Sequence, residues 1–222
     1  MSKVICTLHG GDDSVIRSPG FRSALAAAGA TAVQLNLDDS EVAGAMRFGP
    51  GELISAVVSI WTDGAPAEVV RVVGEAVTDP EPHAYRVTEL VRLDPEPVGD
   101  GVRSDVLANV ALLRRPAAMS REDYLEYWLL RHTAIAIRTQ NTSAYVQNIV
   151  EEVLTPASPE VAAIVEEHFP MAAITDPHVF YGSRGDDEEL RRRIDELMAS
   201  VARFGAGDGL DLVPTSRYFW SL

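Results

Sequence analysis

One order of predicted secondary structure occurs twice along this 222-residue chain, and it limits the possible folds more than any other feature. Strands are predicted where apolar residues alternate, and helices where they recur every three to four residues. The first copy runs strand, helix, strand, strand, helix, strand over residues 3–9, 16–28, 30–37, 52–62, 67–77 and 83–93. The second copy repeats this order over 104–114, 120–138, 143–150, 169–175, 188–204 and 210–220, with an insertion at 154–167.

A proline- and glycine-rich segment, Asp94–Gly101, separates the two copies. We therefore expect a first repeat at 1–96, a linker at 97–103 and a second repeat at 104–222. A βαββαβ unit forms a four-stranded antiparallel sheet with two helices on one face, which is the ferredoxin-like motif. The opposite face of each sheet needs a cover. The predicted fold class is therefore α+β, with two ferredoxin-like repeats whose antiparallel sheets pack face to face or close into one barrel.

The chain is strongly acidic, with a formal net charge of -14 and a sequence pI of about 4.7. Phosphate groups repel such a surface, which argues against nucleic acid or an anionic membrane as a partner. The start of the chain lacks the apolar core of a signal peptide, and no apolar run is long enough to span a bilayer, so we expect a cytoplasmic protein. The single cysteine, Cys6, excludes an internal disulfide and a thiolate metal cluster, and its apolar surroundings predict a buried side chain.

The segment Ser120–Arg138 predicts an amphipathic helix with a histidine on its apolar face. Ser120 is a favourable N-cap, and acidic residues occupy the first turn. The apolar residues that share one stripe of this helix are Tyr124, Leu125, Trp128, Leu129, Ile135 and Ala136. His132 lies in the middle of the stripe. It is either a core histidine hydrogen-bonded to a carbonyl group or an ionisable group in a pocket.

A set of residues in the second repeat resembles the signature of EthD-type proteins: Met119–Tyr124, Tyr127–Trp128, His132–Ala134, Tyr145 and Asn148. In that family a Met-Ser helix start precedes an aromatic residue, a Tyr-Trp pair and a histidine followed by small residues, and a strand with a tyrosine comes next. The resemblance implies a dimeric α+β barrel. Because the first-repeat helix has neither tryptophan nor histidine, it implies a fused pseudo-dimer in which one half carries the motif.

The chain departs from the family pattern at the predicted strand 169–175. The stretch 169–176, FPMAAITD, lacks the acidic strand residue that is usual in the family, and Asp176 would stand in its place.

Histidine, carboxylate and tyrosine are the residue types left to carry chemistry, since the sequence shows neither a phosphate-binding loop nor a Ser-His-Asp order. Burial would lower the pKa of His132 and leave the ring neutral, which suits a general base. His178 is the second candidate, unless it is an exposed loop histidine. Asp176 would orient it, and Tyr181 would donate to a developing oxyanion. Further candidates for lining a substrate pocket are Tyr124, Trp128 and Tyr145.

Two alternatives with a bound cofactor have less support from the spacing of the histidines. A metal site would require His132, His178 and Asp176 to converge, and the sequence has no helical pair of histidines four residues apart. A haem would be held by His132. We therefore expect neither a metal nor another cofactor.

Two functions follow from the resemblance and the residues. The first is a cofactor-independent acid/base enzyme of dehydratase, cyclase, isomerase or lyase type, acting on a small hydrophobic substrate that is aromatic or polyketide-like, with His132 as general base or acid. The second is a non-catalytic accessory protein that binds a hydrophobic small molecule alongside an oxygenase. A cavity that exposes His132 and a second ionisable group would favour the enzyme. The first repeat leaves an apolar surface by which two chains would pair into a homodimer of pseudo-dimers.

Overall fold

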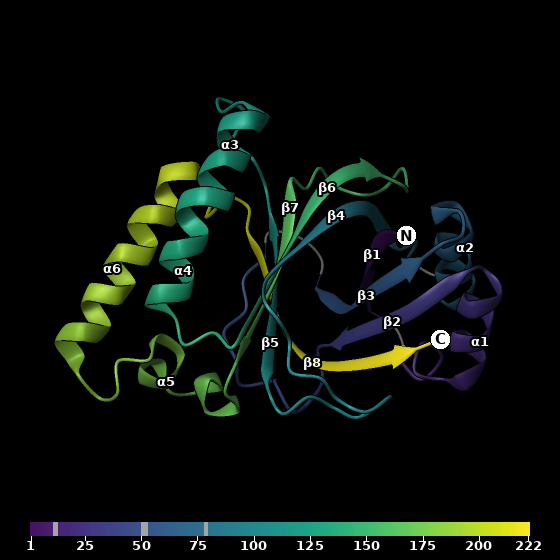
Figure 1. Cartoon of the computed structure of the whole chain (residues 1–222), viewed down its shortest axis with the longest axis horizontal. Helices are drawn as coiled ribbons and strands as arrows, with labels where there is room; N and C mark the ends of the chain where they lie inside the picture. The colour runs from purple at the N-terminus through teal and green to yellow at the C-terminus, as the bar shows by residue number, and fades with distance from the viewer. Residues whose placement is uncertain (11–12, 50–52, 78–79) are drawn as a thin grey trace.

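The computed structural model describes residues 1–10, 13–49, 53–77 and 80–222 (Figure 1). The elements of the first repeat are β1 (Ser2–His9), α1 (Pro19–Ala27), β2 (Ala30–Leu37), β3 (Ile54–Thr62), α2 (Pro66–Ala76) and β4 (His83–Leu93). The predicted order of this repeat is confirmed, and Glu52, the expected start of its third strand, lies outside the described residues. Helix α1 begins where Ser18 Oγ accepts a hydrogen bond from the Phe21 N–H at 3.1 Å.

The second repeat follows the same order, except that its first helix is divided into α3, η1 and α4 and that η2 and α5 are added before α6. Its elements are β5 (Leu107–Leu113), α3 (Arg121–Tyr127), the π-helical turn η1 (Trp128–His132), α4 (Thr133–Thr139), β6 (Ala144–Val153), β7 (Ala163–Phe169), the 3₁₀ turn η2 (Met171–Ile174), α5 (Pro177–Tyr181), α6 (Asp187–Phe204) and β8 (Asp211–Ser221).

The third strand of the second repeat lies earlier than the sequence predicted. The expected strand at 169–175 is wrong, because β7 occupies 163–169 and overlaps the expected insertion 154–167. Pro170 explains why the strand stops, since its ring fixes φ and it has no N–H to donate to a neighbouring strand. The adjacent pair Glu166–Glu167 is typical of an exposed segment, because carboxyl groups are seldom buried, so the sequence pattern did not indicate a buried strand here.

The described strands form one closed antiparallel barrel in the order β1-β3-β2-β8-β5-β7-β6-β4. Each repeat contributes the strand order of a ferredoxin-like sheet, and the two sheets join where β2 pairs with β8 and β4 pairs with β6. Helices α1 and α2 lie outside the barrel at one end of the molecule, and α3, α4 and α6 lie at the other (Figure 1). This arrangement confirms the predicted α+β fold of two ferredoxin-like repeats in a barrel. The boundary at 97–103 stays a prediction.

Alternation along each strand divides the side chains between the barrel interior and the face that the helices cover. Apolar residues of both repeats meet in the interior, among them Ile5, Val57, Val110 and Leu112. Each sheet therefore covers the other, as expected. Cys6 belongs to the cluster between the first sheet and its helices, and it is buried as predicted. Among the described helices, none has an apolar stretch long enough to cross a lipid bilayer.

A buried ionic cluster centred on Glu166 shares the barrel interior with this apolar layer. The Glu166 carboxylate accepts hydrogen bonds from Gln34 Nε2 at 2.6 Å and Asn36 Nδ2 at 3.3 Å, both on β2. His168 Nε2 lies 2.7 Å from the carboxylate, and Arg217 Nε lies 3.7 Å from it. Burial alone would raise the pKa of Glu166, but the His168 hydrogen bond and the neighbouring positive charges outweigh burial and hold the pKa at about 2. The cluster therefore links β7 of the second repeat to β2 of the first.

Candidate active site

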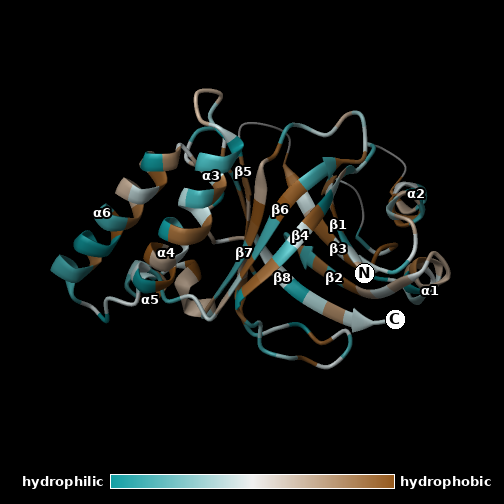
Figure 2. Cartoon of the chain, turned by 45° about the horizontal axis from the view of Figure 1, so that its top comes forward, coloured by the Kyte–Doolittle hydropathy of each residue, from teal (hydrophilic) through white to brown (hydrophobic). Residues whose placement is uncertain are grey.

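A cavity of about 400 Å³ lies between the sheet of the second repeat and the helices that cover it. Most of its lining is apolar. The polar side chains in the lining are Asn109, His132, Gln140, Tyr145, Glu167 and Tyr181. Hydrophilic and hydrophobic residues alternate along α6 (Figure 2), and its residues in the cavity lining are Leu197, Met198, Val201 and Phe204. The volume and the few polar groups on apolar walls are typical of sites that bind small molecules.

His132 reaches the cavity from a widened turn in the helix that the sequence predicted. This helix begins at Ser120, whose Oγ accepts a hydrogen bond from the Asp123 N–H at 3.0 Å. Helices α3 and α4 are continuous through η1, where the π-helical turn holds one more residue than an α-helical turn. Thr133 Oγ1 donates to the Trp128 carbonyl oxygen at 2.8 Å across this turn. Trp128 and His132, its first and last residues, both line the cavity. Turns of this kind are frequent at functional sites.

The His132 ring is almost completely buried, with 8% of the residue exposed. Its Nδ1 lies 3.0 Å from Ser200 Oγ on α6, and its ring centroid lies 4.8 Å from that of Phe204. Burial lowers the pKa of His132 to about 4, so the ring is neutral at pH 7. Within the described part of the chain, Nε2 makes no hydrogen bond to the protein. This nitrogen is therefore available to a ligand in the cavity.

Glu167 is the second acid/base group of the cavity, and it is not among the residues predicted from the sequence. It lies on β7, in register with Asn109 of β5 on one side and Tyr145 of β6 on the other. The three side chains form a row across the cavity floor, which we call the polar row. The buried Glu167 Oε1 makes no hydrogen bond to any described residue. Burial raises the pKa of Glu167 to about 7, which suits a general acid or base at neutral pH.

A signal for Glu167 is present in the sequence. The EthD resemblance calls for an acidic residue on the third strand of the motif-bearing repeat. Once β7 is placed at 163–169, that strand carries the pair Glu166–Glu167, and Asp176 is not needed in this role. Alternation then sends Glu166 into the barrel interior and Glu167 into the cavity.

The aromatic residues predicted to line a pocket divide into two groups. Trp128, Tyr145 and Tyr181 line the cavity. Burial raises the pKa of Tyr145 well above its usual value, so its hydroxyl stays protonated and can donate a hydrogen bond. Tyr124 is not part of the lining. It is fully buried, and its ring centroid lies 5.4 Å from that of Phe204.

His178 and Asp176 also lie outside the cavity lining. Asp176 caps α5, where its Oδ1 accepts a hydrogen bond from the backbone N–H of His178 at 2.8 Å. The His178 ring is held by Ser183 Oγ, 2.7 Å from Nδ1, and by Asp187 Oδ1, 3.4 Å from Nε2. The structure therefore does not bring these residues together with His132. Among the residues that the structure describes, no group of three or more His, Cys, Asp or Glu side chains is arranged to hold a metal ion.

A loop of the first repeat closes part of the cavity in the second. We call residues 38–49 the cover loop. Its Met46 and Phe48 side chains contribute to the cavity wall. Phe48 pairs with Leu212 of β8 through two backbone hydrogen bonds of 3.2 and 2.9 Å. The site of the second repeat is therefore completed by the first.

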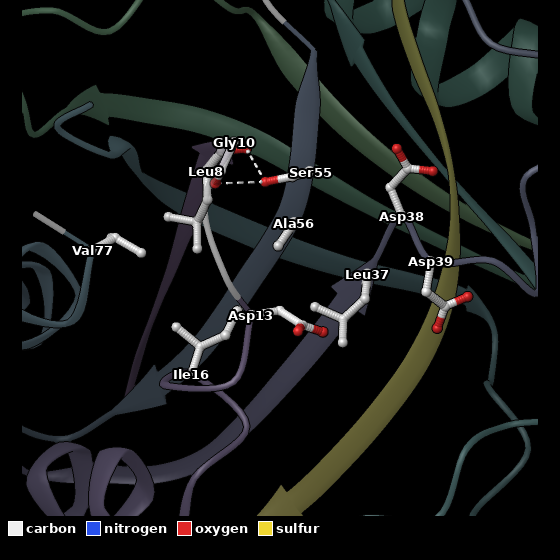
Figure 3. A pocket seen from close by; sticks show the side chains of 10 residues that line it. All are labelled: Leu8, Gly10, Asp13, Ile16, Leu37, Asp38, Asp39, Ser55, Ala56 and Val77. Carbon is white, nitrogen blue, oxygen red and sulfur yellow. Dashed lines mark hydrogen bonds between the residues drawn. The ribbon is translucent and has the colours of Figure 1, made fainter. Parts of the chain in front are cut away.

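A second cavity, of about 340 Å³, lies in the first repeat (Figure 3). Three aspartates line it: Asp13, Asp38 and Asp39. Two of these carboxylates are already paired, Asp13 with Arg17 and Asp38 with Arg47. Among the described residues that line this cavity, none is a histidine, glutamate or tyrosine. The first repeat therefore has a cavity without the polar row or the imidazole of the second.

Glu167 makes the free energy of unfolding depend on pH. The pKa of this carboxyl group is 4.5 when it is exposed to water, as in the unfolded chain, and about 7 in the folded protein. Between these pH values the folded state keeps a proton that the unfolded chain loses. Stability therefore falls as pH rises from about 4.5 to 7, by roughly 2 kcal/mol for a carboxyl group that partly faces a cavity. We expect Glu167→Gln to remove this loss. Urea denaturation of both proteins at pH 5 and pH 8 measures the difference, and equal pH slopes would contradict the raised pKa.

No protein-family profile matches the chain, and no curated protein matches it either. Solved structures do match it. One, described as an anthrone oxidase-like protein, aligns with a TM-score of 0.54 and 11% identity over 99% of this chain and 92% of its own. A proposed monooxygenase from Lactobacillus acidophilus NCFM aligns with a TM-score of 0.48 and 9% identity over 99% of this chain and 95% of its own. Another, from Fusobacterium nucleatum subsp. nucleatum, aligns with a TM-score of 0.47 and 8% identity over 99% of this chain and 94% of its own. At such low identity the likeness shows the fold alone, and the chain has the dimeric α+β barrel fold of an anthrone oxidase-like protein.

Proposed function

We propose that this protein is a cofactor-independent acid/base enzyme that acts on a small hydrophobic substrate of aromatic or polyketide type. The observation that carries the proposal is the pair of ionisable groups on the wall of one apolar cavity, Glu167 and His132. Burial moves their pKa values in opposite directions relative to their references, to about 7 and about 4. Pairs whose environments shift their pKa values in this way are typical of acid/base catalysis.

The pKa values assign a role to each group. Glu167 is the stronger base at neutral pH, so its carboxylate takes a proton from a C–H next to a carbonyl group or from a phenol O–H. His132 is neutral. When the Ser200 hydroxyl donates to Nδ1, the ring carries its hydrogen on Nε2, and this N–H donates a hydrogen bond to the oxygen where negative charge develops. Glu167 then returns its proton to another atom of the substrate, which gives an isomerised, cyclised or eliminated product.

Two likenesses support the aromatic substrate. The residues around His132 resemble the EthD-type signature, whose members accompany catabolic or biosynthetic enzymes. One solved structure with this fold is described as an anthrone oxidase-like protein, and an anthrone is a fused-ring aromatic ketone. The CH₂ group across the central ring from the carbonyl of an anthrone is acidic, because the resulting carbanion is delocalised onto the carbonyl oxygen. Loss of this proton matches the proton transfer proposed for Glu167.

The rival function is a non-catalytic accessory protein that holds a hydrophobic compound for an oxygenase. Both functions need the cavity, but only the enzyme needs a general base with a pKa near the working pH. The position of Glu167 in the same cavity as His132 favours the enzyme.

Replacing His132 with alanine separates the two functions. For the enzyme, we expect kcat to fall by about 10²-fold, because the donor to the developing oxyanion is lost. The substrate would first be found by screening aromatic ketones and phenols for compounds that raise the melting temperature. His178→Ala is the matched control, since His178 lies outside the cavity, and it should retain full turnover. If wild-type protein binds such compounds but never turns them over, and His132→Ala changes only their affinity, the accessory function is correct.

A further inference from the structure

A second compartment of about 290 Å³ adjoins the main cavity. The residues that line both are Met46, Asn109, Phe180, Tyr181 and Leu212. The far wall of the second compartment is apolar and comes from η2 and the start of β5, with Ala173 and Leu107 among its residues. Asn109 and its neighbours are therefore all that stands between the main cavity and an apolar space.

Asn109 lies at the junction of the two compartments. Only 5% of the residue is exposed, and its buried Oδ1 makes no hydrogen bond to any described residue. It is also the cross-strand neighbour of Glu167, whose Oε1 has no partner among the described residues either. Two adjacent side chains in the cavity wall therefore each carry a buried polar atom that has no partner among the described residues.

Unsatisfied buried polar groups are uncommon, because each loses its hydrogen bonds to water and gains nothing in return. In a ligand site the cost is recovered when the ligand supplies the missing partner. A hydroxyl group suits this position best, because it can donate to an amide oxygen or accept from an amide nitrogen. The apolar walls on both sides of Asn109 suit a ligand whose remaining surface is hydrocarbon.

We propose that Asn109 anchors the hydroxyl group of an elongated aromatic ligand whose body extends past it into the second compartment. The inference rests on the proposed function, since it specifies the substrate class of the same cavity. The ligand is thus a phenol with at least one ring beyond the ring that faces Glu167. Asn109 holds it and positions it for proton transfer.

The first test uses Asn109→Leu, which keeps the side-chain volume and removes the amide. The probes are 2-naphthol and 2-methylnaphthalene, which have the same shape and differ in the hydroxyl group. Isothermal titration should show that the variant binds 2-naphthol about 5- to 10-fold more weakly and binds 2-methylnaphthalene as wild type does. The melting temperature of the ligand-free variant should be equal or higher, because an unpaired polar group has been removed from the interior. Equal losses for both probes, or none, would overturn the anchoring role, as would a lack of 2-naphthol binding by wild type.

If Asn109→Leu does not fold, Asn109→Ala replaces it in the same comparison, because it removes the amide without adding apolar bulk. A lower melting temperature with unchanged discrimination between the two probes would mean that Asn109 only supports the strand, and the proposal fails.

The second test fills the far compartment with Ala173→Leu. Its matched control is Ala172→Leu, one residue earlier on η2 and exposed. Ala173→Leu should weaken binding of 6-phenyl-2-naphthol at least 10-fold and leave 2-naphthol unchanged, whereas the control should bind both as wild type does. Equal effects on both phenols would show that the ligand does not enter this compartment.

The two proposals fail in different ways. If binding depends on Asn109 and on the hydroxyl group but no ligand is turned over, the proposed enzymatic function is wrong and the anchoring role of Asn109 is supported. If Asn109→Leu turns over an aromatic substrate at an unchanged KM, the proposed enzyme is supported and the anchoring role of Asn109 is wrong.

Discussion

Replacing Glu167 with glutamine is expected to lower turnover by about 10³-fold or more while the barrel stays folded. Glutamine has nearly the same volume as glutamate but cannot accept a proton. It is also neutral, so the substitution removes the cost of ionising a buried carboxyl group and should not reduce stability. Steady-state kinetics with the compound found by thermal shift, together with circular dichroism of the variant, measure both parts of the prediction.

Glu160→Gln is the matched control, because Glu160 is exposed and lies outside the cavity. The pH profile gives an independent check. If Glu167 is the base, kcat/KM of the wild-type protein should rise with pH through an apparent pKa of about 7, because only the carboxylate accepts a proton. A Glu167→Gln variant with wild-type turnover would remove this residue from the mechanism.

Replacing Glu166 with alanine is expected to destabilise the protein by about 3–5 kcal/mol. The substitution leaves the Arg217 guanidinium buried without its carboxylate and removes the acceptor of the Gln34 and Asn36 amide groups. Chemical denaturation at pH 7 measures the free energy of unfolding. Glu152→Ala is the control, since Glu152 pairs with Arg86 on the surface at 2.9 Å, and its loss should cost less than about 1 kcal/mol.

Acid provides a second measurement on the same cluster. The pKa of Glu166 is held at about 2 in the folded protein, below its reference of 4.5. The folded state therefore binds this proton less readily than the unfolded chain does, and the stabilisation is lost as pH falls from about 4.5 to 2. The Glu166→Ala variant should show a shallower loss over this interval. An equal slope in both proteins would indicate that other carboxylates dominate acid unfolding.

Much of the fold could be predicted from periodicity, because most strands and helices here bury apolar residues at regular intervals. β7 was the exception. Glu166 is buried with Gln34, Asn36 and Arg217, which come from β2 and β8 and which no local pattern reveals, and Glu167 next to it faces the cavity. The π-helical turn was also beyond sequence reasoning, because the same residues continue an ideal α-helix equally well.

The candidate site could be predicted in part for the same reasons. His132, Trp128 and Tyr145 were found because a motif and a helical stripe identify them. Glu167 and Asn109 were not predicted. The third strand was expected at 169–175, so Glu167 fell in the expected insertion and not on a strand. Asn109 is a single polar residue in an apolar strand, which forms no recognisable pattern. Met46 and Phe48 could not be found at all, since their place in the wall depends on how the cover loop crosses to the other repeat.

The cover loop has a further consequence for how the site behaves on dilution. When two separate subunits complete each other's sites, a closing segment is lost as the protein concentration falls below the dissociation constant of the dimer. Here the segment that holds Met46 and Phe48 against the cavity belongs to the same chain. Its effective concentration is set by the length of the intervening polypeptide and not by the amount of protein present. The specific activity of the site should therefore stay constant over a dilution series in which a two-chain barrel would open.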